Sequence, residues 1–328
     1  VQTITIAAGT GAIHFQGPLG TIAVPLGALT VENAGTLTLD NAAKITTAGM
    51  VDLAANDNIL IPVELIGAQG IRIRAGRDGS GGFTLATGAN LIAAGAGADI
   101  TVMGGANSGA ISLAGNVTAV DRIYLDAAGG AIDQTAGTVS GATVDFGSHL
   151  GIHGTDSTNG STRELYLTAA SVSAVNTGAG DIRLFNANFG AGAELTALST
   201  KGGNIYFEQA GGNLVVAGDV TSGADPGVDG GDIELVSTDG MTVKARISTV
   251  AGTGGKIDLA NAVVLDAATA SIAVGAGDVI LRIGESDNVL IVSIPLLKAE
   301  PITIVSKGDI IVRSTIETSG AAADVILI

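Results

Sequence analysis

The chain has 328 residues, of which 50 are glycine and none is cysteine, and its 31 acidic against 15 basic side chains give a net charge of −16. This charge argues against nucleic acids and anionic membrane surfaces as partners, because proteins bind both through lysine and arginine. The lack of cysteine excludes disulfides and thiolate metal sites, and a hydrophobic fraction of 46% is too high for a disordered chain.

The first residue is Val1, and no charged-then-apolar leader follows it. We therefore interpret the chain as a processed piece whose targeting signal is not included. Its longest apolar run, residues 289–297, is far shorter than the about 20 residues that a membrane-spanning helix needs. We expect no membrane span.

Residues 1–34 follow a less regular pattern than the rest of the chain. Gln2–Ile6 alternates between polar and apolar residues, as a half-buried strand does, but Pro18 and Pro25 interrupt the pattern further on. Because proline has no N–H for a strand ladder, it belongs at edges and corners. We interpret this segment either as an irregular entry or as the first coils of the fold that follows.

From Gly35 onward, short segments with alternating apolar residues recur roughly every 10 to 20 residues, separated by glycine or asparagine. They are Thr36–Leu39, Met50–Leu53, Ile71–Ile73, Phe83–Leu85, Ile100–Val102, Ile111–Leu113 and Ile123–Leu125. Successive side chains of a strand point to opposite faces, so each segment buries its apolar residues on one side. Short strands at regular spacing predict an all-β array.

The second half of the chain repeats one motif, a glycine and a polar residue followed by an apolar–any–apolar triplet. Its copies are Gly180–Leu184, Gly203–Phe207, Gly230–Leu235, Gly255–Leu259, Gly277–Leu281 and Gly308–Val312, at intervals of 22 to 31 residues. Self-similarity at such a period, without helical segments between the copies, is typical of a solenoid. We predict an all-β, right-handed parallel β-helix (β-solenoid) of about 14 coils, on the order of 70 Å long at the usual strand spacing.

Three segments break the repeat within the continuous solenoid that we predict for 35–328. Residues 154–163 and 223–230 are rich in glycine and polar residues, and residues 285–301 contain two prolines. Such residues favour turns and interrupt strands. We interpret all three segments as short loop excursions from the coils.

Asp225, Asp229 and Asp232 cluster in a glycine-rich turn. Ca²⁺ takes about six to eight oxygen ligands, often from such loops. These three aspartates are therefore the candidate metal ligands, and Ca²⁺ is the one possible cofactor. Their spacing does not match an EF-hand loop, and solvated turn carboxylates are the alternative.

Two further pairs of residues have the chemistry of a site. His149 and His153 are four residues apart, so on one strand they would share a face and could bind a metal or act in catalysis. Polar residues at the start of a loop are the alternative interpretation. Arg72 and Arg74 also share a face, but the sequence shows no carboxylate-rich partner strand for them.

An enzyme that acts on polysaccharides is the main alternative to a structural role, because some lyases and hydrolases are β-helices. Such an enzyme needs carboxylates or basic residues gathered at one patch. The outward positions here carry mostly Thr, Ser, Asp and Asn, and aromatic residues make up only 3% of the chain. We therefore predict no catalytic residues and no enzyme.

The motif copies at Gly180–Leu184, Gly230–Leu235 and Gly277–Leu281 resemble the repeats of filamentous-haemagglutinin-type adhesins and related giant β-helical surface proteins of bacteria. The resemblance covers roughly Gly35 to the end, without the secretion-domain motifs of that family. It implies a rigid, secreted shaft outside the cell or on its surface, used for adhesion or matrix building, with a host or matrix surface as ligand.

Residues 323–328 are a bare apolar strand, and no polar capping repeat follows Ile316. An open coil end invites pairing with another strand. We therefore expect end-to-end self-association, or further repeats of the same longer chain. The predicted function is a non-catalytic structural segment of an extracellular fibre or cell-surface adhesin, joined by strand stacking; the alternative is a carbohydrate-active β-helix enzyme, a polysaccharide lyase or hydrolase.

Overall fold

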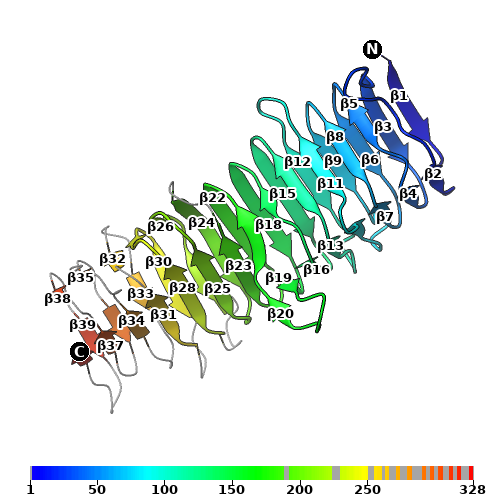
Figure 1. Ribbon diagram of the computed structural model, residues 1–328. Helices are drawn as coiled ribbons and strands as arrows, with labels where there is room; N and C mark the ends of the chain where they lie inside the picture. Colours follow the sequence, from blue (N-terminus) through cyan, green and yellow to red (C-terminus); the bar gives the residue numbers. More distant parts are fainter. Residues whose placement is uncertain are drawn as a thin grey trace. The chain divides into compact units, whose positions relative to one another are not determined.

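A computed structural model describes residues 2–187, 192–223, 230–249 and 255–260, together with the backbone of the strands between residues 263 and 327. Throughout these residues the chain is all-β and contains no helix, and almost all of its strands pair in parallel (Figure 1). The chain divides into two compact units, Val1–Ala169 and Ala170–Ile328.

In the first unit, successive turns of the chain add strands to three parallel ladders. The first ladder consists of β1 (Thr3–Ala7), β3 (Ala28–Asn33), β6 (Val51–Ala54), β9 (Ile71–Arg74), β12 (Ile100–Met103), β15 (Arg122–Ala127) and β18 (Thr143–Ser148). The second consists of β2 (Ile13–Phe15), β4 (Leu37–Leu39), β7 (Ile59–Ile61), β10 (Phe83–Leu85), β13 (Ile111–Leu113), β16 (Ala131–Gln134) and β19 (Gly151–Thr155). The third consists of β5 (Ile45–Thr47), β8 (Glu64–Gly67), β11 (Asn90–Ala93), β14 (Asn116–Ala119), β17 (Val139–Ser140) and β21 (Leu165–Thr168).

The second unit also has three ladders, and two of them begin on the long strands β22 (Ser171–Asn176) and β24 (Ala193–Thr200). The fourth ladder continues from the first half of β24 to β26 (Leu214–Val216), β29 (Met241–Val243), β32 (Val263–Leu265), β35 (Leu290–Val292) and β38 (Ile310–Val312). The fifth continues from its second half to β27 (Val220–Ser222), β30 (Arg246–Thr249), β33 (Ser271–Ala273), β36 (Leu296–Lys298) and β39 (Ile316–Thr318). The sixth consists of β23 (Ile182–Asn186), β25 (Ile205–Gln209), β28 (Ile233–Ser237), β31 (Ile257–Ala260), β34 (Val279–Arg282), β37 (Ile302–Val305) and β40 (Val325–Leu327).

The predicted fold class, an all-β parallel β-solenoid, is confirmed. Side chains are described for about 10 turns, fewer than the about 14 coils that the sequence predicted for the whole length; the remaining strands are described by their backbone alone. The right-handed winding stays a prediction.

The core is narrow and consists of the inward residues of each strand. On β12, for example, Ile100 and Val102 are fully buried while Thr101 between them faces outward. Leucine, isoleucine, valine and alanine fill most inward positions, and the largest fully buried side chains are Phe83 and Phe207. Burying one such aliphatic side chain stabilises the fold by roughly 2 kcal/mol, so the stack of coils supplies its own core without a covering layer.

Glycine is required where the corners of successive turns lie directly on one another. A Cβ atom on Gly203 would meet the carbonyl oxygen of Gly180 at 2.2 Å, and one on Gly231 would meet the carbonyl oxygen of Gly203 at 2.5 Å. No side chain fits at these distances. The glycine of the repeated motif therefore marks a point of contact between backbones of adjacent coils.

The segments predicted to be irregular lie as follows. Residues 1–34 contribute β1, β2 and β3 to the ladders. Within 154–163, β19 pairs in antiparallel fashion with β20 (Thr162–Arg163), forming a short hairpin. Of residues 223–230, six (224–229) lie outside the described residues. Residues 285–301 contain the backbone of the two strands β35 and β36.

Candidate functional site

The predicted calcium ligands are only partly covered by the structure. Asp225 and Asp229 lie outside the described residues. Asp232, which immediately precedes β28, accepts the backbone N–H of Lys256 through Oδ1 at 2.7 Å. In the part of the chain that the structure describes, no group of three or more His, Asp or Glu residues could hold a metal ion. The calcium site stays a prediction.

The bond from Lys256 to Asp232 belongs to a series that we call the cap ladder. In this series Asp181 Oδ1 accepts the N–H of Asn204 at 2.7 Å. Asn204 Oδ1 in turn accepts the N–H of Asp232 at 2.9 Å. Asp181, Asn204 and Asp232 thus each cap the residue at the same motif position one turn further on, as a helix N-cap satisfies an otherwise unpaired amide. The series ends at Lys256, whose side chain has no acceptor.

The first unit uses the same device at several corners. Asp99 Oδ1 accepts the N–H of Arg122 at 3.1 Å, and Asn58 Oδ1 accepts the N–H of Gly82 at 2.8 Å. These bonds join positions 23 and 24 residues apart in the sequence. Asp and Asn at corners therefore have a structural role that does not require a ligand.

The two histidines do not share one strand, so the expectation that they lie on one face is wrong. His149 lies in the bend between β18 and β19, because β19 begins only at Gly151. His153 lies on β19, with Nδ1 at 3.4 Å from Oδ1 of Asp133. Only His153 is therefore positioned by a strand.

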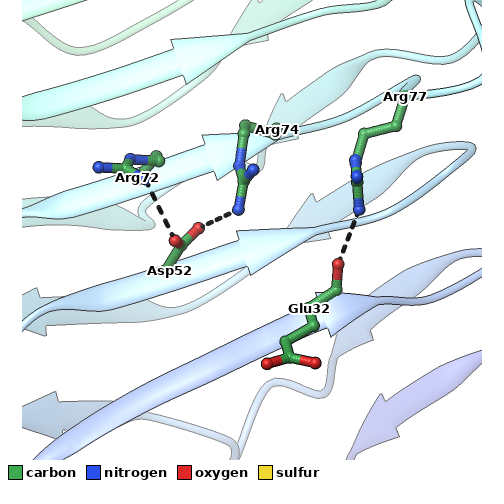
Figure 2. Close-up of polar contacts among 5 residues, drawn as sticks. All are labelled: Glu32, Asp52, Arg72, Arg74 and Arg77. Atoms are coloured by element: carbon green, nitrogen blue, oxygen red, sulfur yellow. Dashed lines mark hydrogen bonds and ion pairs between the residues drawn. The ribbon is translucent and has the colours of Figure 1, made fainter. Parts of the chain in front are cut away.

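The predicted arginine pair does have a carboxylate partner. Asp52 on β6 lies directly opposite Arg72 on β9, and its two oxygens lie 3.5 Å from Nη1 of Arg72 and 2.9 Å from Nη2 of Arg74 (Figure 2). Arg77, which follows β9, reaches across to β3 and donates to the backbone carbonyl of Glu32 at 2.8 Å. The Glu32 carboxylate itself points away from Arg77 (Figure 2). Charged groups from neighbouring turns thus meet on the outer face of the first ladder.

A second cluster lies on the same face, around Tyr124 of β15. The Arg122 guanidinium carbon lies 5.5 Å from the centre of the Tyr124 ring, and Arg122 Nε donates to Oδ2 of Asp145 at 2.6 Å. The Tyr124 hydroxyl donates to Oδ2 of Asp126 at 3.0 Å. Burial, and then the charge of Asp126 and the hydrogen bond to it, raise the pKa of Tyr124, so the hydroxyl keeps its proton, and its bond to Asp126, to a higher pH than a free tyrosine would.

A hollow of about 330 Å³ adjoins this cluster, lined by Asp99, Ile100, Thr101, Arg122 and Tyr124. It combines one aromatic ring with a carboxylate, a guanidinium and a hydroxyl. Arg122 and Asp126 flank Tyr124 two residues away in the sequence, on the same face of a strand, but only the strand register adds Thr101 and Asp145 from the neighbouring turns.

Both clusters contribute residues to one row of outward side chains that crosses five neighbouring strands of the first ladder. In register, the row consists of Asp52, Arg72, Thr101, Tyr124 and Asp145. We call this row the outer strip. Sequence reasoning found Arg72 but missed its partners, because residues 20 or more positions apart become neighbours only once the length of each turn is known.

Comparison with known proteins gives no match: no protein-family model fits the chain, and no curated protein and no solved structure is significantly similar to it. The described residues also include no apolar helix of membrane-spanning length.

Proposed function

We propose that the chain is a non-catalytic structural segment, a shaft, of an extracellular fibre or cell-surface adhesin. The observation that carries this proposal is the cap ladder, in which the side chain of one turn satisfies the backbone of the next from Asp181 to Lys256. Together with the parallel backbone ladders, it makes each turn depend on its neighbours. Such a stack resists separation of its turns along its whole length.

End-to-end joining by strand stacking is part of this proposal. The same hydrogen bonds recur from turn to turn, so a further coil, from a second copy or from more of the same protein, adds by contacts already present in the stack. The acidic composition, with a net charge of −16, and the resemblance of the repeats to bacterial surface proteins support a location outside the cell.

Electron microscopy of the native full-length protein tests the shaft function. We expect elongated rods that give an axial repeat of about 4.8 Å in fibre diffraction. Isolated monomers or compact globules as the only species would contradict it.

A carbohydrate-active enzyme is the second candidate, and the outer strip is the observation in its favour. It brings Asp and Arg from different turns to one face, as a lyase or hydrolase requires. However, Asp52 and Asp145 are each already held by an arginine, which suits an ion pair better than a general acid or base. Release of reducing or unsaturated ends from neutral and acidic polysaccharides by the full chain would favour the enzyme over the shaft.

A further inference from the structure

The hollow beside Tyr124 has the size and the lining of a small ligand site. Its volume of about 330 Å³ is at the lower end of known ligand pockets, enough for a single small ring. It lies on the outer face of the first ladder, where β12 and β15 pair with Thr101 opposite Tyr124. The site is therefore built entirely within the first unit.

Its side chains are fixed before any ligand arrives. The Tyr124 hydroxyl is bound to Asp126 at 3.0 Å, and Arg122 is bound to Asp145 at 2.6 Å. The backbone N–H of Arg122 donates to Asp99 at 3.1 Å. A lining held in this way loses little conformational entropy on binding, which favours affinity for a weakly held ligand.

The mixture of groups indicates the class of ligand. A pyranose ring has an apolar face that packs on an aromatic ring, and a rim of hydroxyls that donate to carboxylates and accept from guanidinium groups. Tyr124 offers the ring, Asp99 and Thr101 offer oxygens, and Arg122 offers N–H donors. A purely apolar ligand would displace water from the remaining donors and acceptors of these groups without replacing its hydrogen bonds, at a cost in affinity.

The charge around the hollow indicates that the sugar is neutral. The hollow is lined by the carboxylate of Asp99 and the guanidinium of Arg122, and two more carboxylates, those of Asp126 and Asp145, are bonded to Tyr124 and Arg122. The next cation along the strip, Arg72, is paired with Asp52. A uronate or a sulfated sugar would meet net repulsion there.

The outer strip gives the direction in which a longer glycan would run. From Tyr124 the row continues to Thr101, Arg72 and Asp52, one polar side chain for each strand spacing of about 4.8 Å. Arg72, with 46% of its side chain exposed, presents donors beyond its contact with Asp52. Hydroxyls of successive sugar units can therefore meet a polar partner at each step.

We infer that the hollow around Tyr124 binds one residue of a neutral glycan, and that the outer strip holds the adjoining residues along the ladder. This inference is independent of the proposed shaft function, because it concerns one face of the first unit and no end of the stack.

A glycan array that carries neutral and anionic oligosaccharides, probed with the full chain, tests the inference. Neutral glycans that bind are then titrated against the Tyr124→Ala variant by calorimetry. We expect the affinity to fall by about 10-fold or more, because the ring contact is lost. Tyr124→Phe keeps the ring and is expected to lose less than about 3-fold.

Tyr166→Ala is the matched control. Tyr166 on β21 is exposed and, like Tyr124, lies under an arginine, with the Arg163 guanidinium carbon 5.2 Å from its ring centre, but it does not line the hollow. Its replacement is expected to leave affinity unchanged. If Tyr124→Ala does not fold, as judged by circular dichroism, Thr101→Val removes one lining hydroxyl and is expected to weaken binding by a few-fold.

Three results would overturn the inference. They are an array with no neutral ligand, binding confined to anionic glycans, and an equal loss of affinity in Tyr124→Ala and Tyr166→Ala. Rods in electron microscopy together with an empty array would remove the glycan site and leave the shaft function standing.

Discussion

The two units close their corners in different ways. In the first unit the inward position at the end of the first-ladder strands carries alanine at Ala55, Ala75 and Ala127, each no more than 3% exposed. A polar side chain enters this position only at the last strand, β18, where buried Ser148 lies opposite Ala127. In the second unit the position at the end of the fifth-ladder strands carries Asn176, Thr200, Ser222 and Thr249, which are equally buried. One fold thus encloses methyl groups at one set of corners and polar groups at another.

At the polar corners, side-chain hydroxyls form hydrogen bonds with backbone groups of the glycine turns. Thr200 Oγ1 donates to the carbonyl of Gly180 at 3.0 Å and accepts the N–H of Gly203 at 3.2 Å. Ser222 Oγ repeats this arrangement with the carbonyl of Gly203 at 2.8 Å and the N–H of Gly231 at 2.7 Å. A buried backbone group needs a partner, so a corner whose glycine carbonyl points inward requires a polar side chain.

Ala127→Asn tests this comparison most severely, because it places the residue type of the second unit at a corner of the first. Ala127 is fully buried, so the larger amide has neither space nor an established partner. We expect a loss of about 3 kcal/mol in the free energy of unfolding, measured by urea denaturation. Ala128→Asn, at the exposed neighbouring position, is the control and should change stability by less than about 0.5 kcal/mol. Equal stability of the two variants would show that alanine corners are not a packing requirement.

Thr200→Val makes the opposite exchange in the second unit, keeping shape and removing the hydroxyl. The carbonyl of Gly180 and the N–H of Gly203 then lose this partner, and we expect a cost of about 2 kcal/mol. Hydrogen exchange at the Gly203 amide should accelerate accordingly. Ser199→Ala, one residue earlier and half-buried, should be nearly neutral. If Thr200→Val is as stable as the wild-type chain and its Gly203 amide stays protected, the buried polar corner residues do not have the role proposed for them.

Asn204→Ala compares the stability contributed by the cap ladder with that contributed by the buried polar corner residues Asn176, Thr200, Ser222 and Thr249. It removes the acceptor of the Asp232 N–H, and since this amide can turn to water instead, we expect a smaller cost of about 1 kcal/mol. The Asp232 amide should exchange faster in this variant. Asn204→Asp keeps an acceptor and should retain most of the stability. If Asn204→Ala loses more free energy of unfolding than Thr200→Val, the cap ladder contributes more to stability than the buried polar corner residues.

Asp52→Asn is expected to have the smallest effect. It weakens the ion pairs with Arg72 and Arg74 on the partly exposed outer face of the first unit, where such pairs contribute about 0.5 kcal/mol. Thermal unfolding in low and in molar salt should show that the difference from the wild-type chain shrinks as salt rises. A large loss of thermal stability that does not change with salt would show that the outer strip has a structural role.

The sequence predicts the strands well, because each apolar–any–apolar triplet has one face to bury. Ile100–Val102 and Ile233–Leu235, for example, lie within β12 and β28. The glycine corners were also predictable from the motif. Their cause, backbone packed directly on backbone at Gly203 and Gly231, needed the structure.

The partners across turns were not predictable, because they depend on the length of each coil. Asp52 became visible as the partner of Arg72 and Arg74 only in register. One signal was present for the polar corners: Asn176 and Thr200 precede the motif glycines Gly180 and Gly203 by four and three residues. A buried Asn, Thr or Ser shortly before such a glycine therefore marks this type of corner.

The cap ladder has a consequence for how such a protein changes in length. Because Asp181, Asn204 and Asp232 each accept from the residue that follows one turn later, a gene duplication of one whole repeat would insert a turn that finds its donor and its acceptor already in place. Unequal recombination can thus lengthen or shorten the molecule by whole repeats without leaving an amide unsatisfied. Insertions of other sizes would break the series, and we expect natural length variants to differ by complete repeats.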